Sequence, residues 1–315
     1  MAKLKALLLT EGYHGMISQV EGLAKALQAE FQHKIVRLNW PWNFIPPKLT
    51  PISEIILKDK HYINENKSFD LVISCGRKSV IPSAIIKKKN TNIFTIHIQD
   101  PKVNYKNFDV IIAPEHDDLK GENVISSKGS IHYITQSEIE KAKNYLVNKF
   151  QNENIVSLIL GGPTKYYSFS NEELTQVFRK IKSNFISQGH KVLVIPSMRT
   201  PKRIIDLAMK EFAKEGFVVN TVDKQAYLSA LALATNIVVT CDSTSMISEA
   251  AASGKPIFVA HMEPKKNNYR FEKFFQLFRE MGITKVLGEK VDNWTYNRFN
   301  EADRIATLMR KKLTN

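Results

Sequence analysis

The segment Thr240–Ala260 has a residue order that could hold a phosphorylated ligand. An apolar run leads into a turn of small hydroxyl residues, where a helix is expected to begin. The N–H groups and the dipole at such a helix start attract a diphosphate. The candidates at that start are Ser243, Thr244 and Ser245. Glu249 follows about one and a half turns later, where its carboxylate could accept two hydrogen bonds from a ribose diol.

The same residues fit an ordinary βαβ unit with a capped helix and a solvent-facing Glu249, so the pattern alone leaves both interpretations open. Two loops after other apolar runs, Gly161–Lys165 and Ser197–Pro201, offer further groups. An arginine can bind a diphosphate through two hydrogen bonds. Lys165 could contact a phosphate or remain a solvated loop lysine. The expected contacts from these loops are Gly162, Lys165, Ser197 and Arg199.

The first half of the chain also places polar residues where apolar runs end. The loop after the first run contains two glycines around a histidine, which permits a tight turn and the close approach of a ligand. A second glycine-containing loop follows Leu71–Ser74. The candidate site residues in these two loops are Gly12, His14, Gly15, Gly76 and Arg77.

These loops need alternating strands and helices to position them, and the sequence has that alternation throughout. Short apolar runs of strand length alternate with stretches of helical periodicity. The expected strands are Lys5–Thr10, Lys34–Leu38, Leu71–Ser74, Asn92–Ile98, Val110–Ala113, Ile155–Leu160, Lys191–Ile195, Phe217–Asn220, Ile237–Thr240 and Ile257–Ala260. The expected fold is therefore α/β, with two Rossmann-like doubly wound domains whose strand ends face a shared cleft.

The repeat of the pattern sets the expected domain boundaries. Residues 1–150 form the first domain and residues 151–293 the second, and a helix at about 294–312 could pack back on the first. Two capping boxes mark helix starts, one at Ser137 with Glu140 and one at Ser170 with Glu173. A further helix over Tyr269–Met281 has one aromatic and one basic face, which suits either core packing or a membrane-proximal surface.

Six short segments occur in an order that resembles one known family. They are Gly76–Lys78, Gln99–Lys102, Pro114–Asp117, Gly161–Lys165, Ser197–Pro201 and Asp242–Met246. Together they span most of the chain and look like the bacterial branch of the "elongated mitochondria" family of mitochondrial-fission proteins. The segment after Thr240 also resembles the nucleotide-sugar signature of GT-B glycosyltransferases, which implies a ribose-binding role for Glu249. The loop Glu11–Met16 departs from the family, because its usual arginine and asparagine are absent.

The resemblance implies a GT-B-like, metal-independent glycosyltransferase. It would use a nucleotide-sugar as substrate, without a cofactor, and would act on a cell-envelope glycolipid or polysaccharide. The donor would bind the second domain and the acceptor the first. A non-catalytic adaptor of the mitochondrial-fission type and a nucleotide-sugar epimerase are the alternatives.

Transfer to a hydroxyl group needs a general base, and the first half of the chain offers several. The catalytic candidates are Asp100, Glu115 and His116, with Asp117 and His14 as further candidates. Asp100 precedes Pro101, so an Asx turn explains it equally well. The Asp117-Asp118 pair lacks the spacing of metal ligands, so no metal site is expected.

Composition limits the compartment and the partners. The chain has 315 residues, of which 43% are hydrophobic, and this suits two domains. It has no apolar run of ~20 residues that could span a bilayer, and its two cysteines give no disulfide framework, so a cytoplasmic location is expected. The net charge is +14, yet no nucleic-acid-binding motif is present. Two explanations of the positive charge remain open. The charge could attract an anionic membrane surface or a lipid-linked acceptor, which implies a peripheral position at the inner face of the membrane. Alternatively, it reflects a biased amino-acid composition.

Overall fold

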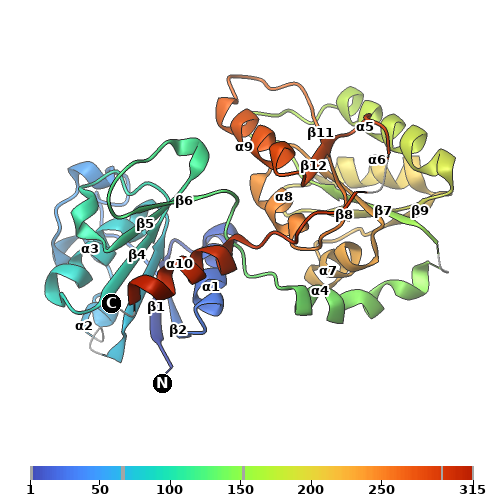
Figure 1. Ribbon diagram of the computed structural model, residues 1–315. Coiled ribbons are helices and arrows are strands. Elements are labelled where there is room, and N and C mark those ends of the chain that lie inside the picture. Colours follow the sequence, from blue (N-terminus) through green and yellow to red (C-terminus); the bar gives the residue numbers. More distant parts are fainter. Residues whose placement is uncertain (1–2, 65–67, 151–152, 292–293, 314–315) are drawn as a thin grey trace. The chain divides into compact units, whose positions relative to one another are not determined.

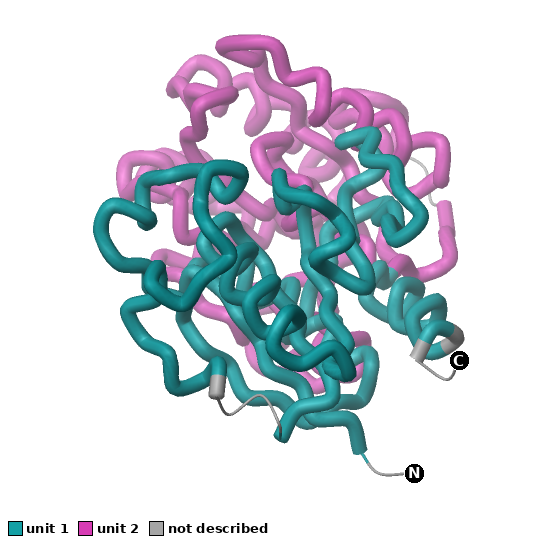
Figure 2. Tube along the Cα trace, turned by 90° about the vertical axis from the view of Figure 1, so that its left-hand side faces the viewer, with its two compact units in different colours: residues 1–133, 300–315 teal, residues 134–299 magenta. Residues whose placement is uncertain are grey.

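Each half of the chain builds a six-stranded parallel sheet in the computed structural model, which describes residues 3–64, 68–150, 153–291 and 294–313 (Figure 1). The chain divides into two units (Figure 2). Unit 1 comprises Met1–Tyr133 and Asn300–Asn315, and unit 2 comprises Ile134–Phe299. The α/β class with two Rossmann-like sheets that the sequence predicts is confirmed.

Unit 1 has its strands in the order β2-β1-β3-β4-β5-β6. The strands are β1 (Lys5–Thr10), β2 (Glu30–Ile35), β3 (Leu71–Cys75), β4 (Phe94–Ile98), β5 (Val110–Pro114) and β6 (Val124–Ser127). The helices are α1 (His14–Ala26), α2 (His61–Asn64), α3 (Val80–Lys89) and α10 (Glu301–Leu313). All neighbouring strands pair in parallel, so their carboxyl ends and the loops that follow them lie at one edge.

The alternation of side chains along β1 explains why helices cover both faces of this sheet. Leu8 enters a core with Leu23 of α1 and Ile305 of α10. Leu9 points to the opposite face and enters a core with Ile85 of α3. The strands are therefore buried on both faces, as their continuous apolar runs predict.

Unit 2 has its strands in the order β12-β11-β10-β7-β8-β9. The strands are β7 (Ile155–Leu160), β8 (Lys191–Pro196), β9 (Gly216–Val218), β10 (Asn236–Thr240), β11 (Ile257–Ala260) and β12 (Thr284–Val286). The helices are α4 (Gln136–Ala142), α5 (Asn171–Asn184), α6 (Lys202–Phe212), α7 (Lys224–Leu233), α8 (Thr244–Ala251) and α9 (Tyr269–Glu280). The strand order reverses between β7 and β10, and in unit 1 it reverses between β1 and β3. Such switch points are where doubly wound sheets bind ligands.

The units divide at Tyr133, whereas the sequence places the joint near residue 150. The reason is that α4 packs against α7 within unit 2. The chain after α4 is also held there, because the Tyr145 hydroxyl donates to Asp223 at 2.6 Å and the Leu146 N–H donates to Ser229 Oγ at 3.1 Å.

The last helix begins at Glu301 and not at about residue 294. Residues 294–300 have no regular secondary structure, and residues 294–299 belong to unit 2. The Trp294 indole N–H donates to the Gly282 carbonyl at 3.0 Å, and the Tyr296 hydroxyl donates to the Lys255 carbonyl at 2.9 Å. The helix α10 itself packs against α1 of unit 1.

Several local predictions need correction. The edge strands β6 and β12 are short and were not predicted. Strand β2 occupies Glu30–Ile35 and not Lys34–Leu38, and Leu38 instead forms an antiparallel bridge with Leu57. The capping box at Ser170 and Glu173 is present, but α4 begins with Thr135 and Glu138 as its capping box in place of Ser137 and Glu140.

Candidate functional site

Asp242 lies at the switch point of unit 2, directly after β10. Its side chain is fully buried, and its carboxylate accepts hydrogen bonds from the Thr240 hydroxyl at 2.7 Å and the Gly162 N–H at 3.3 Å. The Thr240 hydroxyl in turn accepts from the Gly161 N–H at 2.8 Å. The Asp242 carboxylate therefore fixes the backbone that follows β7 to the end of β10.

The two glycines after β7 allow this arrangement because no side chain fits at either position. A Cβ atom on Gly161 would lie 2.0 Å from an Asp242 carboxylate oxygen. A Cβ atom on Gly162 would lie 1.9 Å from the Arg199 carbonyl oxygen. The close approach of three loops at this edge thus requires glycine at both positions.

Arg199 joins the same cluster from the loop after β8. Its guanidinium donates to the Asp242 carboxylate at 2.5 Å, and 46% of its side chain remains exposed. One side of the guanidinium is held in place while the rest is accessible to a ligand. A buried carboxylate that orients an exposed arginine suits the recognition of a diphosphate.

Ser197 shapes the turn that carries Arg199. The Ser197 Oγ atom accepts from the Arg199 N–H at 3.3 Å and lies 3.1 Å from Thr200 Oγ1. Thr200 in turn donates to the carbonyls of Leu160 at 2.9 Å and Gly161 at 2.7 Å. Ser197 is therefore engaged within its own turn, and Thr200 links the loops after β7 and β8.

The start of α8 follows Asp242 directly. Ser243 is the N-cap residue, and its hydroxyl accepts from the Met246 N–H at 3.3 Å. Thr244 and Ser245 are the first two helical residues, and both are half-buried. The helix start therefore lies beside the ion pair of Asp242 with Arg199. It adds the positive end of a helix dipole to this cluster.

Glu249 lies on α8 and is half-buried, so it does not simply face solvent. Its carboxylate accepts a hydrogen bond from the Tyr227 hydroxyl of α7 at 3.0 Å. Burial raises the pKa of Glu249 to about 7, and the hydrogen bond from Tyr227 opposes this rise. Near neutral pH this carboxylate is partly protonated and partly ionised, so a ligand that prefers one form can select it.

The raised pKa of Glu249 predicts a pH-dependent stability. Its ordinary value is 4.5 and its folded value is about 7, so the folded chain binds more protons between these values. The free energy of unfolding should therefore fall as the pH rises through this window. Glu249→Gln removes this dependence, so the urea midpoint of the parent should decrease relative to that of the variant between about pH 5 and 8. Equal pH dependence in both proteins would contradict the assignment.

Lys165 is exposed and lies 5.0 Å from the ring centroid of Tyr166, where Lys266 lies at the same distance. The loop that carries it is tight, because Thr164 accepts from the N–H groups of Tyr166 and Tyr167 at 3.1 and 3.2 Å. Lys165 is therefore placed by the aromatic ring of Tyr166 and has no described contact with the Asp242 cluster.

The candidate bases of unit 1 follow β4 and β5, which are neighbouring strands. Asp100 forms an Asx turn, because its carboxylate accepts from the Lys102 N–H at 2.9 Å, and it also pairs with the Lys102 ammonium. Glu115 is exposed and His116 is half-buried at the start of a short 3-10 helix. His116 Nε2 lies 3.7 Å from an Asp117 carboxylate oxygen. Asp100 therefore has a structural partner, while Glu115 and His116 stay candidates.

The switch point of unit 1 brings together the loops after β1 and β3. The Glu11 carboxylate accepts from the Lys78 N–H at 3.1 Å, and Gly76 adopts a φ of 95° close to Met16 and Glu11. Arg77 points elsewhere and donates to the carbonyls of Asn43 at 2.5 Å and Ile45 at 2.9 Å. Arg77 thus holds the loop of Asn43 and Ile45 in place, and its expected acceptor-side position stays a prediction.

The remaining acceptor-side candidates lie at the start of α1. Gly12 adopts a φ of 89° next to Ile35, and Gly15 has open space where a side chain would be. His14 Nε2 lies 3.3 Å from the Tyr133 hydroxyl. Near the end of β4, His97 is buried beside Ser74, and burial lowers its pKa to about 3.

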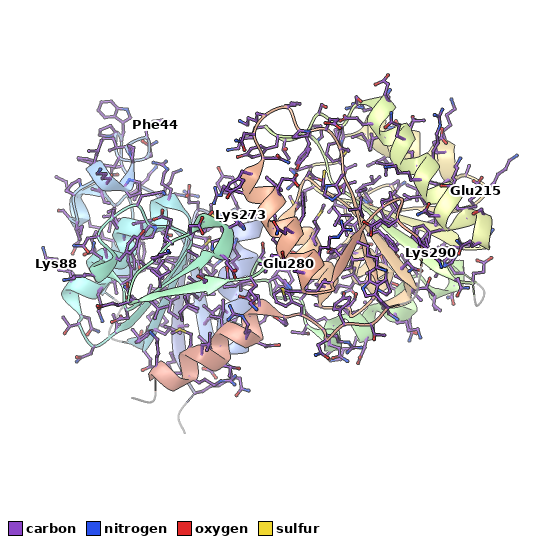
Figure 3. All side chains as sticks on the ribbon, turned by 45° about the horizontal axis from the view of Figure 1, so that its top comes forward. Phe44, Lys88, Glu215, Lys273, Glu280 and Lys290 are labelled. Carbon is purple, nitrogen blue, oxygen red and sulfur yellow. The ribbon has the colours of Figure 1, made fainter. Side chains whose placement is uncertain are left out.

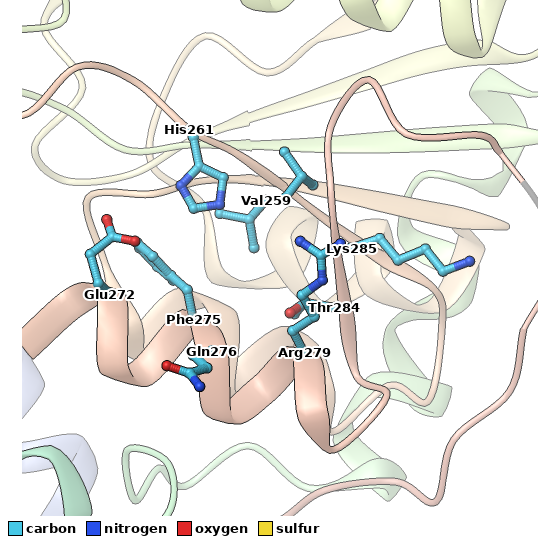
Figure 4. A pocket seen from close by; sticks show the side chains of 9 residues that line it. Val259, His261, Glu272, Phe275, Gln276, Arg279, Thr284 and Lys285 are labelled. Atoms are coloured by element: carbon cyan, nitrogen blue, oxygen red, sulfur yellow. The ribbon is translucent and has the colours of Figure 1, made fainter.

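A pocket of about 510 Å³ is lined by residues of α9, β11 and β12 and by His261, and Asp242 is not among its lining residues (Figure 4). Arg279 at its wall is paired with Glu289 at 2.8 Å, and Lys285 lies 4.6 Å from the ring centroid of Trp294. On α9, Phe274, Phe275 and Phe278 are buried. The aromatic face of α9 therefore packs in the core, and this excludes it as a membrane-proximal surface.

The sequence interpretation missed the residues that organise the site. The sequence alone assigns no role to Asp242, Thr200 or Tyr227, because their contacts join segments that are distant in the chain. The glycine pair at 161–162 was the available signal, since two adjacent glycines after a buried strand indicate a close approach. Within the described ranges, no group of three or more His, Cys, Asp or Glu side chains could hold a metal ion. No helix in the same ranges is long and apolar enough to cross a membrane.

Comparison with known proteins identifies a family and relatives. The family model for mitochondrial fission ELM1 matches residues 14–313. The uncharacterized protein RP120 of Rickettsia prowazekii is 27% identical, and the match covers 91% of this chain and 93% of that protein. The mitochondrial fission protein ELM1 of Arabidopsis thaliana is 24% identical over 77% of this chain, which spans 64% of the plant protein's length.

Solved structures share the fold. The UDP-GlcNAc 2-epimerase of Methanocaldococcus jannaschii is 14% identical with a TM-score of 0.56, covering 98% of this chain and 99% of that one. MurG of Acinetobacter baumannii is 11% identical with a TM-score of 0.50, covering 99% of this chain and 91% of that one. The GT-B-like fold expected from the sequence is thereby confirmed, and these low identities establish the fold alone.

Proposed function

Because this chain belongs to the mitochondrial fission ELM1 family and has the fold of GT-B enzymes, we propose that it is a glycosyltransferase that uses a nucleotide-sugar donor. The observation that carries the proposal is the cluster at the switch point of unit 2. There, Arg199 is oriented by buried Asp242 beside the start of α8, and Glu249 lies further along that helix.

In this proposal each group of the cluster has one role. The start of α8 and Arg199 bind the donor diphosphate, and the ionised Glu249 carboxylate accepts hydrogen bonds from the ribose hydroxyls. When the sugar leaves, negative charge develops on the diphosphate, and the helix dipole and the guanidinium stabilise it. This electrostatic set supplies the stabilisation that a metal ion provides in other transferases, so the proposed mechanism is metal-independent.

The acceptor side belongs to unit 1 in this proposal. A general base removes the proton from an acceptor hydroxyl, whose oxygen then attacks the anomeric carbon as the diphosphate departs. Glu115 and His116 are the better candidates, since Asp100 is held in its Asx turn. The net charge of +14 supports an acceptor or surface that is anionic, such as a lipid-linked glycan of the cell envelope, and a peripheral position at the inner face of the membrane.

Arg199→Ala tests the diphosphate role. We expect the Kd of a nucleoside diphosphate to rise about tenfold, because a charge-assisted hydrogen bond of about 1.5 kcal/mol or more is lost. The Kd of the matching nucleoside should stay unchanged. Isothermal titration calorimetry over a panel of bases measures both values. Lys202→Ala is the matched control, since Lys202 is an exposed neighbouring cation that pairs with Asp206 within α6. Equal losses for nucleoside and nucleoside diphosphate would contradict a diphosphate contact.

A non-catalytic adaptor is the second candidate, and membership of the mitochondrial fission ELM1 family supports it. An adaptor would bind its partner after Arg199→Ala and Glu249→Ala and would consume no nucleotide-sugar. Incubation with nucleotide-sugars and membrane extracts, followed by product analysis, separates the candidates. Release of the nucleoside diphosphate with a glycosylated product supports transfer, whereas a changed sugar without any acceptor indicates an epimerase.

A further inference from the structure

The loop of residues 39–56 in unit 1, here called the aromatic loop, presents large apolar side chains to solvent. Trp40 is 81% exposed, Phe44 75%, Leu49 70% and Ile55 65%. Figure 3 shows the Phe44 ring projecting outward from the ribbon of unit 1. Single exposed apolar residues are common on protein surfaces, but four within one short loop mark an interaction site.

The aromatic loop is held in place at both its base and its middle. At the base, Leu38 forms an antiparallel bridge with Leu57, and the Asn39 N–H donates to the Ile56 carbonyl at 2.7 Å. In the middle, the guanidinium of Arg77 donates to the carbonyls of the loop. The exposed side chains are therefore presented by a fixed backbone and need no folding before they bind a surface.

The loop has two different apolar faces. Trp42 and Ile52 pack against the unit 1 core that contains Val36 and Ile56. These residues anchor the loop, so Trp40 and Phe44 are not needed for the fold and remain outside. Burial in the core explains why Trp42 and Ile52 are apolar. It does not explain the apolar side chains of Trp40 and Phe44, which face water.

Positive charge is enriched in the sequence that contains the exposed tips. Residues 37–60 carry the cations Arg37, Lys48, Lys58 and Lys60 against the two carboxylates Glu54 and Asp59, and all four cations are exposed. Glu54 is paired with Lys89 of α3, so its charge is compensated. Aromatic tips flanked by lysines match the interface of an anionic bilayer, where Trp favours the headgroup region and each lysine near the surface adds attraction.

We propose that the aromatic loop is a membrane-docking surface that inserts Trp40 and Phe44 among the headgroups of anionic lipids while the neighbouring lysines contact their phosphates. A protein partner fits less well, because a stable interface buries about 800 Å² on each side and needs a broad patch, whereas here a single loop carries the apolar tips. A membrane-docking loop would supply the contact for the peripheral membrane position in the proposed function. Only the biological purpose of the loop rests on that proposed function.

Vesicle sedimentation of the full chain tests the proposal without any donor or acceptor, so its failure leaves the nucleotide site untouched. We expect the chain to pellet with phosphatidylcholine vesicles that contain phosphatidylglycerol and much less with phosphatidylcholine alone. The double variant Trp40→Ser with Phe44→Ser should lower the partition coefficient at least about tenfold, because two aromatic rings no longer enter the interface. Tyr269→Ser is the matched control, since Tyr269 is 61% exposed on unit 2, and it should change nothing.

The contribution of charge is tested with a pair of variants that alter the net charge equally. Lys48→Glu with Lys60→Glu should weaken binding to the anionic vesicles about tenfold or more at low salt. Lys210→Glu with Lys214→Glu, two exposed positions of unit 2, should weaken it by less than about twofold. Equal losses from both pairs, or no loss from the loop variants, would overturn the proposal.

A spectroscopic measurement locates the contact in the intact protein. With Trp42 and Trp294 changed to Phe, Trp40 is the remaining tryptophan of the three in the chain. Its emission should shift to shorter wavelength on addition of anionic vesicles and be quenched by brominated lipids. An unchanged spectrum while the chain still pellets would place the membrane contact elsewhere and overturn the assignment. A different result would identify a second copy of the chain as the partner of the aromatic loop. In that case neither the parent nor the variants would pellet with vesicles, and Trp40→Ser would abolish self-association of the chain.

Discussion

Gly162→Ala is expected to abolish measurable binding of nucleoside diphosphates under conditions in which the parent binds. The new Cβ atom would lie 1.9 Å from the Arg199 carbonyl oxygen and 2.4 Å from its carbon, so the backbone after β7 or after β8 must move. That movement separates the Gly162 N–H from Asp242 and displaces Arg199. The free energy of unfolding should also fall by about 1–3 kcal/mol, as for other overpacked sites. Calorimetry gives the affinity and urea unfolding gives the stability.

Gly15→Ala is the matched control for this variant. Apart from its two chain neighbours and the backbone of its own helix, no heavy atom of the described residues lies within 4 Å of the position where its Cβ would be, and the residue is in the first turn of α1. The free energy of unfolding should stay equal or rise by up to ~1 kcal/mol, because alanine is the better helix former. If Gly162→Ala bound nucleotide as the parent does, the junction of the three loops would not be the donor site.

Glu249→Ala should weaken both nucleosides and nucleoside diphosphates about 10- to 100-fold, since hydrogen bonds to a charged group contribute about 1.5–3 kcal/mol. This differs from Arg199→Ala, which should affect the diphosphate alone. A ribose diol binds the ionised carboxylate best, so the affinity of the parent should increase as the pH rises through the Glu249 pKa of about 7. Glu249→Gln should show no such pH dependence.

Tyr227→Phe sharpens the same test. The hydrogen bond from Tyr227 lowers the pKa of Glu249, so its loss should move the pH dependence of affinity to higher pH while the affinity at high pH is largely retained. Titration calorimetry at a series of pH values measures the shift. An affinity of the parent that is independent of pH would show that Glu249 does not contact the ligand through its carboxylate.

The sequence predicts the central strands well because each one has a distinct physical signature. Strands β7 and β10 are continuous apolar runs, buried on both faces, and they end at glycines or small polar residues. The edge strands β6 and β12 are short and only partly buried, so their sequences carry no comparable pattern. Their pairing depends on neighbours that are distant in the chain.

The candidate site was predicted in part for the same reason. The start of α8 and Arg199 were identified because each has a local signature, namely a hydroxyl turn before a helix and a cation after a strand. The role of Asp242 depends on contacts with Gly162 and Arg199, which lie 80 and 43 residues away in the chain. No local pattern reports a contact of that kind. Arg77 shows the same limit, because its position after β3 gives no sign of its hydrogen bonds to the aromatic loop.

The helix α10 has a consequence for the order in which the chain can fold during synthesis. The core of unit 1 includes Ala302, Ile305, Ala306 and Met309, so it is incomplete until α10 has left the ribosome. Unit 2 ends at Phe299 and has all of its strands and helices before then. The unit whose sequence is translated first is therefore the one completed last, and the face of its sheet beside α1 stays exposed to water and to chaperones while unit 2 is made.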